Sequence, residues 1–259
     1  MKSWLPCALL LCGCSVGLDG YKFDKGPCEP EVTLNDDFDG NTLGSCWKIH
    51  NAEAASKLGL TGDGKLAIVP KGSTVWDLEG TGPFVFQVVG KTNFSARLAV
   101  STESTMDPTM APASSNHGAG VMIRDPNAEA SFVRYEMGKF NGQLATTAVS
   151  TLDGSYLTEI GEEGGQPVTV SWDGTHAGYL LICRSGLGGE RIAVARRAGD
   201  GASWEEQRVF LRDDLSGDVQ VGVEASCPEA GDLRAVFDSI RFKLLPDDDD
   251  QEDCVRVFE

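Results

Sequence analysis

The chain has 259 residues, and 41% of them are hydrophobic, which is enough for a core and excludes general disorder. Its formal net charge is −17; six acids lie between Asp247 and Asp253, so the remainder still carries −11 (−17 + 6). A body of this charge repels phosphate backbones and anionic lipid surfaces, which excludes a nucleic-acid-binding protein.

The N-terminus predicts an export signal over residues 1–14. Met1 and Lys2 precede a short apolar run, too short to span a bilayer, and small residues follow it. The stretch Leu11-Cys12-Gly13-Cys14 resembles the lipobox of lipoprotein signal peptides. That resemblance implies lipidation at Cys14, a cell-envelope and outer-membrane location, and a lipid anchor as the only membrane contact. Ordinary secretion remains open.

After a tether over residues 15–30, short segments with period-two hydrophobicity follow one another between glycine-rich or polar turns. No long stretch has helical spacing. The pattern predicts an all-β chain, a two-sheet antiparallel jelly-roll sandwich over residues 31–245, with residues 101–116 as a long surface loop. Residues 246–259 are predicted to be an acidic tail that carries Cys254. The expected strands include 94–100, 118–124, 132–137, 168–172, 179–184, 191–195, 219–225 and 234–242.

The segment from Phe132 to Met137 shows how such a strand divides its side chains. Val133, Tyr135 and Met137 share one face, which we expect to be buried. Arg134 and Glu136 then point to the opposite, polar face.

Four stretches of the sequence resemble the concanavalin A-like lectin/glucanase superfamily, and within it the laminin-G-like and "regulation of enolase" type jelly-roll domains. They are Asp37-Phe38-Asp39-Gly40 with Leu43 and Trp47; Trp76 with the run from Pro83 to Gly90 and Phe94; Ala119 to Asp125; and Val219 to Ser226 with Ala235 to Phe242. The match spans roughly residues 31–243 and implies the fold, whereas the superfamily's functions range from lectins to hydrolases and adhesion modules.

The stretch from Asn35 to Gly40 begins like an EF-hand loop, but Cys46 stands where that loop needs a glutamate. We therefore predict a strand end and a tight turn there, with Phe38 and Trp47 buried and the aspartates capping backbone amides. By analogy with the superfamily, a structural calcium held by Asp37, Asp39 and Asp238 is a further expectation. No other cofactor is predicted.

Five of the eight cysteines lie outside the signal peptide, so one thiol is left over. The resemblance implies that the first and last strands pair, which brings the residues flanking them to one edge. We therefore predict a disulfide between Cys28 and Cys254, with Cys46 as the buried free thiol. Competing pairings are Cys28 with Cys46, and Cys183 with Cys227.

The glucanase relatives carry a Glu-x-Asp-x-x-Glu strand, because retaining cleavage needs two neighbouring carboxyl groups. This sequence has none, so no catalytic residue is predicted. We expect an exported glycan-binding domain whose ligand contacts an exposed Trp76 and a concave sheet; a structural or adhesive envelope domain and a divergent glycosidase remain alternatives. The predicted ligand-binding residues are Trp76, Arg124, Arg134, Glu136, Gln220 and Glu224. The oligomeric state is not predicted.

Overall fold

A computed structural model describes residues 28–76, 80–229, 231–246 and 253–259. The predicted signal peptide, Cys14 and most of the predicted tether lie outside the described residues, as do residues 247–252 of the predicted acidic tail. Within the described ranges, no helix is long and apolar enough to cross a membrane.

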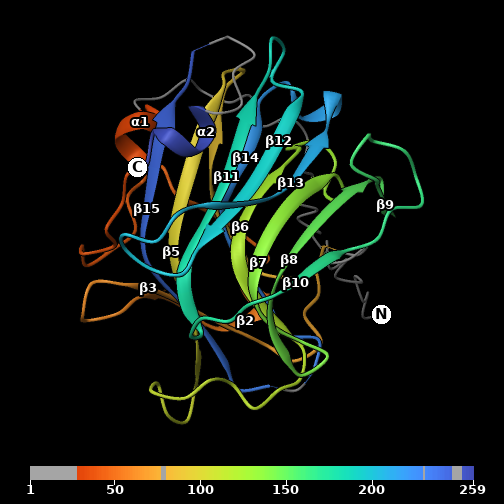
Figure 1. Ribbon diagram of the computed structural model, residues 1–259. Coiled ribbons are helices and arrows are strands. Elements are labelled where there is room, and N and C mark those ends of the chain that lie inside the picture. Colours follow the sequence, from red (N-terminus) through yellow and green to blue (C-terminus); the bar gives the residue numbers. More distant parts are fainter. Residues whose placement is uncertain (1–27, 77–79, 230, 247–252) are drawn as a thin grey trace, which may run out of the picture.

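Two antiparallel sheets make up the molecule (Figure 1). The eight-stranded sheet contains, in spatial order, β1 (Lys48–His50), β4 (Phe84–Val89), β14 (Val219–Ser226), β6 (His117–Arg124), β7 (Phe132–Phe140), β8 (Gln143–Leu152) and β10 (Val168–Ser171), with β9 (Ser155–Tyr156) paired to β8. The seven-stranded sheet contains β13 (Glu205–Leu211), β12 (Arg191–Arg197), β11 (Ala177–Ser185), β5 (Phe94–Ser104), β15 (Leu233–Leu244), β3 (Leu66–Pro70) and β2 (Ala55–Leu60).

The main core lies between the sheets. Alternate residues of β7, namely Val133, Tyr135 and Met137, pack in the same buried cluster as Leu98 of β5 and Ile182 of β11. Strand alternation explains this, since every second side chain faces the opposing sheet. The predicted all-β, two-sheet sandwich is confirmed, and so is the inward face of β7.

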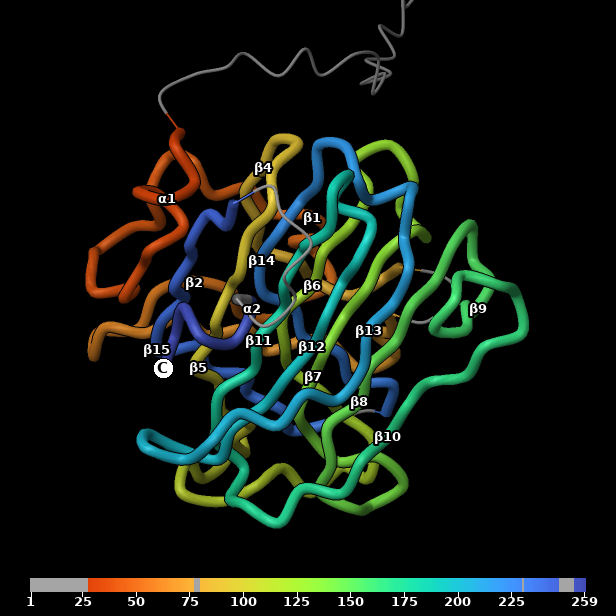
Figure 2. Tube along the Cα trace, turned by 45° about the horizontal axis from the view of Figure 1, so that its top comes forward, coloured from red at the N-terminus to blue at the C-terminus, as the bar shows by residue number. Residues whose placement is uncertain are grey.

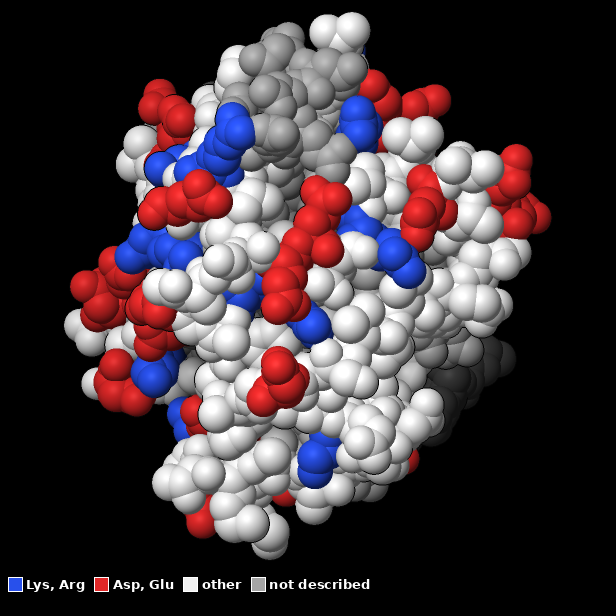
Figure 3. Space-filling view, in the orientation of Figure 1, with Lys and Arg blue, Asp and Glu red and all other residues white. Residues whose placement is uncertain are grey.

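Helices are few and short. They are α1 (Pro30–Thr33), α2 (Asp253–Arg256) and two 3₁₀ turns, η1 (Ala52–Ala54) and η2 (Asp213–Leu215). Figure 2 shows α1 beside the strands at one edge of the molecule. On the face seen in Figure 3, acidic and basic side chains are interspersed.

The first element of the domain is a correction to the sequence prediction. The sequence predicts a first strand that ends near Asp37 and pairs with the last strand, but Pro30–Thr33 form the helical turn α1, with Pro30 at the first helical position, where its fixed φ is favourable. Only Asp36 then pairs with the last strand, through a bridge to Ile240 of β15.

The turn after Asp36 is stabilised by Asp36 itself. One carboxylate oxygen accepts the Phe38 backbone N–H at 2.7 Å, and the other accepts the Trp47 indole N–H at 2.7 Å. Phe38 and Trp47 are buried, as predicted. The aspartates expected to bind calcium have other contacts: Asp37 pairs with Arg241, and Asp238 lies 3.6 Å from Lys65.

No group of three or more potential metal ligands from His, Cys, Asp or Glu occurs in the described part of the chain. Asp37, Asp39 and Asp238 therefore do not form such a group, and a calcium ion at these residues stays an untested expectation.

The predicted Cys28–Cys254 disulfide is wrong. Cys28 bonds to Cys46, one of the competing pairings, and Cys183 of β11 bonds to Cys254 of α2. The free buried cysteine in the described chain is Cys227, not Cys46. The prediction failed because it relied on a first strand that is absent, and because α2 packs on β11 and β5, away from Cys28.

Candidate functional site

The outer face of the eight-stranded sheet, which points away from the other sheet, carries the predicted ligand-binding residues. Backbone register aligns one residue from each of seven strands into a row across this face. In spatial order the row is His50, Phe84, Glu224, Gly120, Glu136, Thr147 and Thr169. Gly120 contributes no side chain to this row, and Glu224 and Glu136 are its neighbours on either side.

Two parallel rows continue this face. The next one contains Phe86, Gly222, Met122, Arg134 and Val149, and the one beyond it contains Val88, Gln220, Arg124, Phe132 and Thr151. The polar members are thus surrounded by apolar ones. Arg124 donates from Nε to the Gln220 side chain at 2.8 Å, and its guanidinium lies 5.6 Å from the Phe84 ring centre.

Trp76 lies over this face and is completely buried, so the expected exposed platform is wrong. Its ring packs edge-on against Phe84 and Phe132, with centroids 6.0 and 6.1 Å apart. Gly82 lies against the indole, since a Cβ there would come 2.1 Å from Nε1. Loop contacts hold this arrangement: Thr74 bridges to Cys227.

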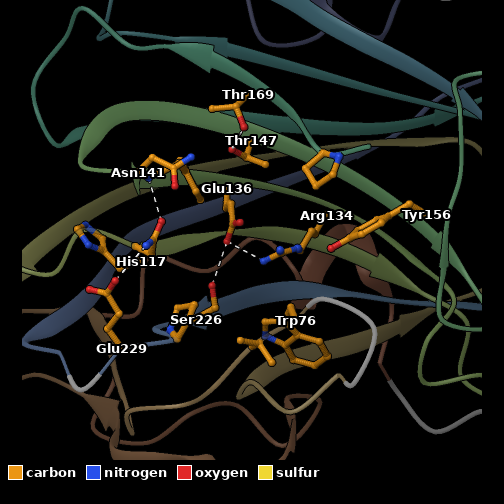
Figure 4. Close-up of a pocket in the computed structure, with 15 residues that line it drawn as sticks. Trp76, His117, Arg134, Glu136, Asn141, Thr147, Tyr156, Thr169, Ser226 and Glu229 are labelled. Atoms are coloured by element: carbon orange, nitrogen blue, oxygen red, sulfur yellow. Dashed lines mark hydrogen bonds and ion pairs between the residues drawn. The ribbon is translucent and has the colours of Figure 1, made fainter. Parts of the chain in front are cut away.

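A pocket of about 440 Å³ opens beside Trp76 (Figure 4). This volume falls in the usual range for small-molecule sites. Its walls combine aromatic rings with planar or hydroxyl-bearing polar groups. The residues that line it include Trp76, Asn116, His117, Arg134, Glu136, Asn141, Tyr156, Ser226 and Glu229.

Glu136 lies at the base of the pocket, between Arg134 and Ser226 (Figure 4). Its Oε2 is 2.9 Å from Arg134 Nη1 and accepts the Ser226 hydroxyl at 3.3 Å. Gly118 makes room for this orientation, because a Cβ there would come 2.2 Å from the same oxygen. A larger residue at Gly118, the strand partner of Ser226, would move the Glu136 carboxyl group out of this orientation.

Glu224 is fully buried in the same row and is not among the residues that line the pocket. Burial, and then the charge of Glu136, raises the pKa of Glu224 well above its usual range, although Arg134 opposes the shift. The carboxyl group of Glu224 is thus biased towards its neutral, protonated form.

The pocket rim is made by loops that approach from the ends of the strands. Glu229 accepts hydrogen bonds from the Ser115 hydroxyl at 2.7 Å and the Asn116 amide at 3.0 Å, which lowers the pKa of its carboxyl group. Asn116 in turn accepts the Asn141 backbone N–H at 2.9 Å. Burial lowers the pKa of His117 to about 4, so its imidazole is neutral at pH 7.

The structure therefore brings Arg124, Arg134, Glu136, Gln220 and Glu224 onto one face, and it places Trp76 above them. Sequence reasoning missed Asn116, His117, Asn141, Tyr156 and Glu229. One signal was available: the Asn141-Gly142 dipeptide is a strong hairpin turn, and it would have placed Asn141 at the end of β7. The rim loops had no such signal.

No protein-family model and no curated protein matches this chain in sequence. Solved structures do match in fold. A functionally unknown protein from Saccharomyces cerevisiae aligns with a TM-score of 0.61 and 17% identity over 78% of this chain and 98% of that chain.

Two kinds of carbohydrate-related protein share the fold. A Bacteroides ovatus protein described as xyloglucan PUL GH43B aligns with a TM-score of 0.64 and 20% identity over 83% of this chain and 40% of its own. The Lotus tetragonolobus seed lectin aligns with a TM-score of 0.53 and 11% identity over 83% of this chain and 100% of its own. The chain thus spans less than half of the GH43 protein. At these identities the likeness shows a lectin-like jelly-roll sandwich and no more.

Proposed function

We propose that the protein binds a carbohydrate in the pocket beside Trp76 and has no catalytic activity of its own. The observation that carries this proposal is the composition of the pocket. Tyr156 offers aromatic surface beside the buried Trp76, while Asn116, Asn141 and Glu136 offer amide and carboxylate groups that hydrogen-bond to sugar hydroxyls. The structural likeness to lectins supports the same class of ligand.

Binding to a glycan array by the full chain tests this proposal. The Asn116→Ala variant removes a rim amide, and we expect binding to weaken about five- to tenfold, the effect of one lost hydrogen bond. Asn127→Ala is the matched control, because Asn127 is exposed in the turn between β6 and β7 and is not a pocket residue. Equal binding by all three proteins would contradict the pocket as the binding site, and no glycan bound by the wild type would favour the structural or adhesive alternative.

Glycoside hydrolysis is the second candidate, because one observation favours it. Glu136 is paired with Arg134, whereas the pKa of Glu224 is raised, and glycosidases use one ionised and one protonated carboxyl group. The burial of Glu224 away from the pocket lining argues against it. Release of reducing sugar from xylan or β-glucan that disappears in Glu136→Gln would establish this activity.

We also propose that the chain belongs to the concanavalin A-like lectin/glucanase superfamily, as a laminin-G-like or "regulation of enolase" type domain. The jelly-roll architecture supports this assignment, as does the placement of three of the four resembling stretches, on β4, on β6, and on β14 with β15. A sequence profile built from close relatives of this chain, tested against these domain types, would check it.

We propose further that the protein is exported and lipidated at Cys14. Two disulfides fit an oxidising compartment outside the cytosol, and the lipobox-like sequence gives the attachment point. Metabolic labelling with a palmitate analogue should be lost in Cys14→Ala, whereas undiminished label would contradict lipidation at this residue.

A further inference from the structure

The side chain of Glu224 is buried without hydrogen-bond partners, which does not stabilise the fold. Its side chain is completely buried, and neither carboxyl oxygen has a hydrogen-bond partner. Among the described residues it is the only carboxyl group with both oxygens in this condition. Nearby, Nη1 of Arg124 and Nε1 of Trp76 are also buried without partners.

An unpaired buried polar group reduces the stability of the folded state, and a well-packed apolar side chain of similar size would be neutral or better. A native protein that keeps such a group usually has a reason other than stability. The clustering of Glu224, Arg124 and Trp76 on one sheet face therefore needs a functional explanation.

These groups lie next to the pocket. Glu224 is in register with Phe84 on one side and, across Gly120, with Glu136 at the pocket base on the other. The Trp76 indole packs on Phe84 and is itself a pocket wall. The indole of Trp76 thus lies between the open pocket and a covered part of the same sheet face, which contains Glu224 and Phe84.

The covered part has the chemistry of a sugar site. Phe84 and Phe86 are stacked with centroids 5.1 Å apart, which gives an aromatic floor. Glu224 and the Arg124–Gln220 pair supply carboxyl, guanidinium and amide groups beside it. A carboxyl group held neutral by burial both donates and accepts, so two sugar hydroxyls can satisfy it.

We propose that Glu224, Arg124 and Gln220 form a second sugar subsite, continuous with the open pocket, which a longer glycan enters by displacing the Trp76 indole. This inference rests on the proposed carbohydrate-binding function and makes it more specific: the ligand is an oligosaccharide chain, not a single terminal sugar. The hydroxyl groups of the entering unit replace the missing partners of Glu224 and of Arg124 Nη1.

Calorimetric titration of the full chain tests the subsite, with xylo-, cello- and laminari-oligosaccharides of two and six units as probes. The wild type should bind one hexasaccharide at least tenfold more tightly than its disaccharide. Glu224→Met should lose this difference and keep the disaccharide affinity. Glu224→Gln keeps the shape and part of the hydrogen bonding, so it should retain an intermediate preference for the hexasaccharide.

Thermal unfolding supplies a readout that needs no ligand. Removal of the unpaired carboxyl group in Glu224→Met should raise the Tm by about 2–6 °C. Thr102→Val is the matched control: its buried hydroxyl is also unpaired, but it lies on β5 of the other sheet, so the variant should gain stability and bind like the wild type.

The outcomes separate the two proposals. A wild type that binds disaccharide and hexasaccharide equally, or a Glu224→Met variant that keeps the hexasaccharide preference or unfolds at a lower Tm, overturns the subsite and leaves the pocket as the carbohydrate site. A wild type that binds none of the probes and no glycan on the array overturns both.

Discussion

Arg184 and Arg124 are both buried, but their guanidinium groups differ in how many hydrogen bonds they make. Burial lowers the pKa of both Arg184 and Arg124 to about 10. Arg184 donates hydrogen bonds to four backbone carbonyl groups, those of Gly90, Thr92, Leu215 and Gly217. Among the described residues, Arg124 makes one side-chain hydrogen bond, to Gln220, and its Nη1 has no partner.

The buried guanidinium group of Arg184 is hydrogen-bonded, whereas buried polar groups in the region around Arg124 are partly unsatisfied. Arg184 joins two loop segments at one end of the sandwich, the one before β5 and the one before β14, so its region is a structural frame in which the guanidinium group is satisfied. The outer sheet face around Arg124 and Glu224 keeps polar groups unsatisfied under an aromatic cover. Satisfied burial stabilises the fold, whereas the unsatisfied groups around Glu224 are those that the proposed sugar subsite would use.

The largest expected effect comes from substituting the two arginines identically. Arg184→Met leaves four carbonyl groups without their donor and should lower the free energy of unfolding by about 4–5 kcal/mol. Arg124→Met leaves one amide oxygen unpaired and should change the free energy of unfolding by about 1 kcal/mol or less. Urea denaturation measures the free energy of unfolding of both variants. Equal decreases would contradict the difference between the two regions.

The disulfide beside Arg184 belongs to the same frame. Cys183 and Cys254 enclose a separation of 71 residues, against 18 for Cys28 and Cys46. On the chain-entropy account their removal should destabilise by up to about 4 and about 3 kcal/mol, respectively. Alanine double variants of each pair, compared by urea denaturation, check the order. A larger loss from the Cys28–Cys46 pair would show that local packing outweighs loop length.

The pH dependence of stability should distinguish Glu224 from an ordinary surface acid. Because its folded-state pKa is raised, the folded protein holds a proton that the unfolded chain releases above the ordinary value of 4.5. This contribution to stability is complete below pH 4.5 and declines as the pH rises towards the raised pKa. Glu224→Gln should remove the decline in a series of urea denaturations from pH 4.5 upward; an unchanged pH profile would contradict a buried, protonated Glu224.

The smallest expected effect is at the pocket wall and has the opposite sign. Burial lowers the pKa of His117 from 6.5 to about 4, so below pH 6.5 the unfolded chain binds a proton that the folded protein does not. Stability from this residue is therefore lost as the pH falls from 6.5 to 4. His117→Gln should flatten that part of the profile, measured by the same denaturation series. A slope that persists in His117→Gln would assign it to other groups.

The hydrophobic pattern of the sequence was enough to predict the two-sheet sandwich and the two faces of each strand. Alternation along β7 is enough to place Val133 in the core and Arg134 with Glu136 on the other side, because successive side chains of a strand point in opposite directions. This local rule holds wherever a strand is recognised. It predicted which candidate residues share a face, but not whether that face is open.

What covers this face and which cysteines pair could not be predicted from the sequence and depended on the tertiary structure. Trp76 is buried because its loop is held by hydrogen bonds from Asn51 to Gly80 and Gly82 and by the bridge between Thr74 and Cys227, contacts between segments far apart in sequence. Cys254 reaches Cys183 for the same kind of reason, since α2 packs on β11. Strand periodicity carries no information on such contacts, because they depend on where loops and termini lie once the two sheets have packed together.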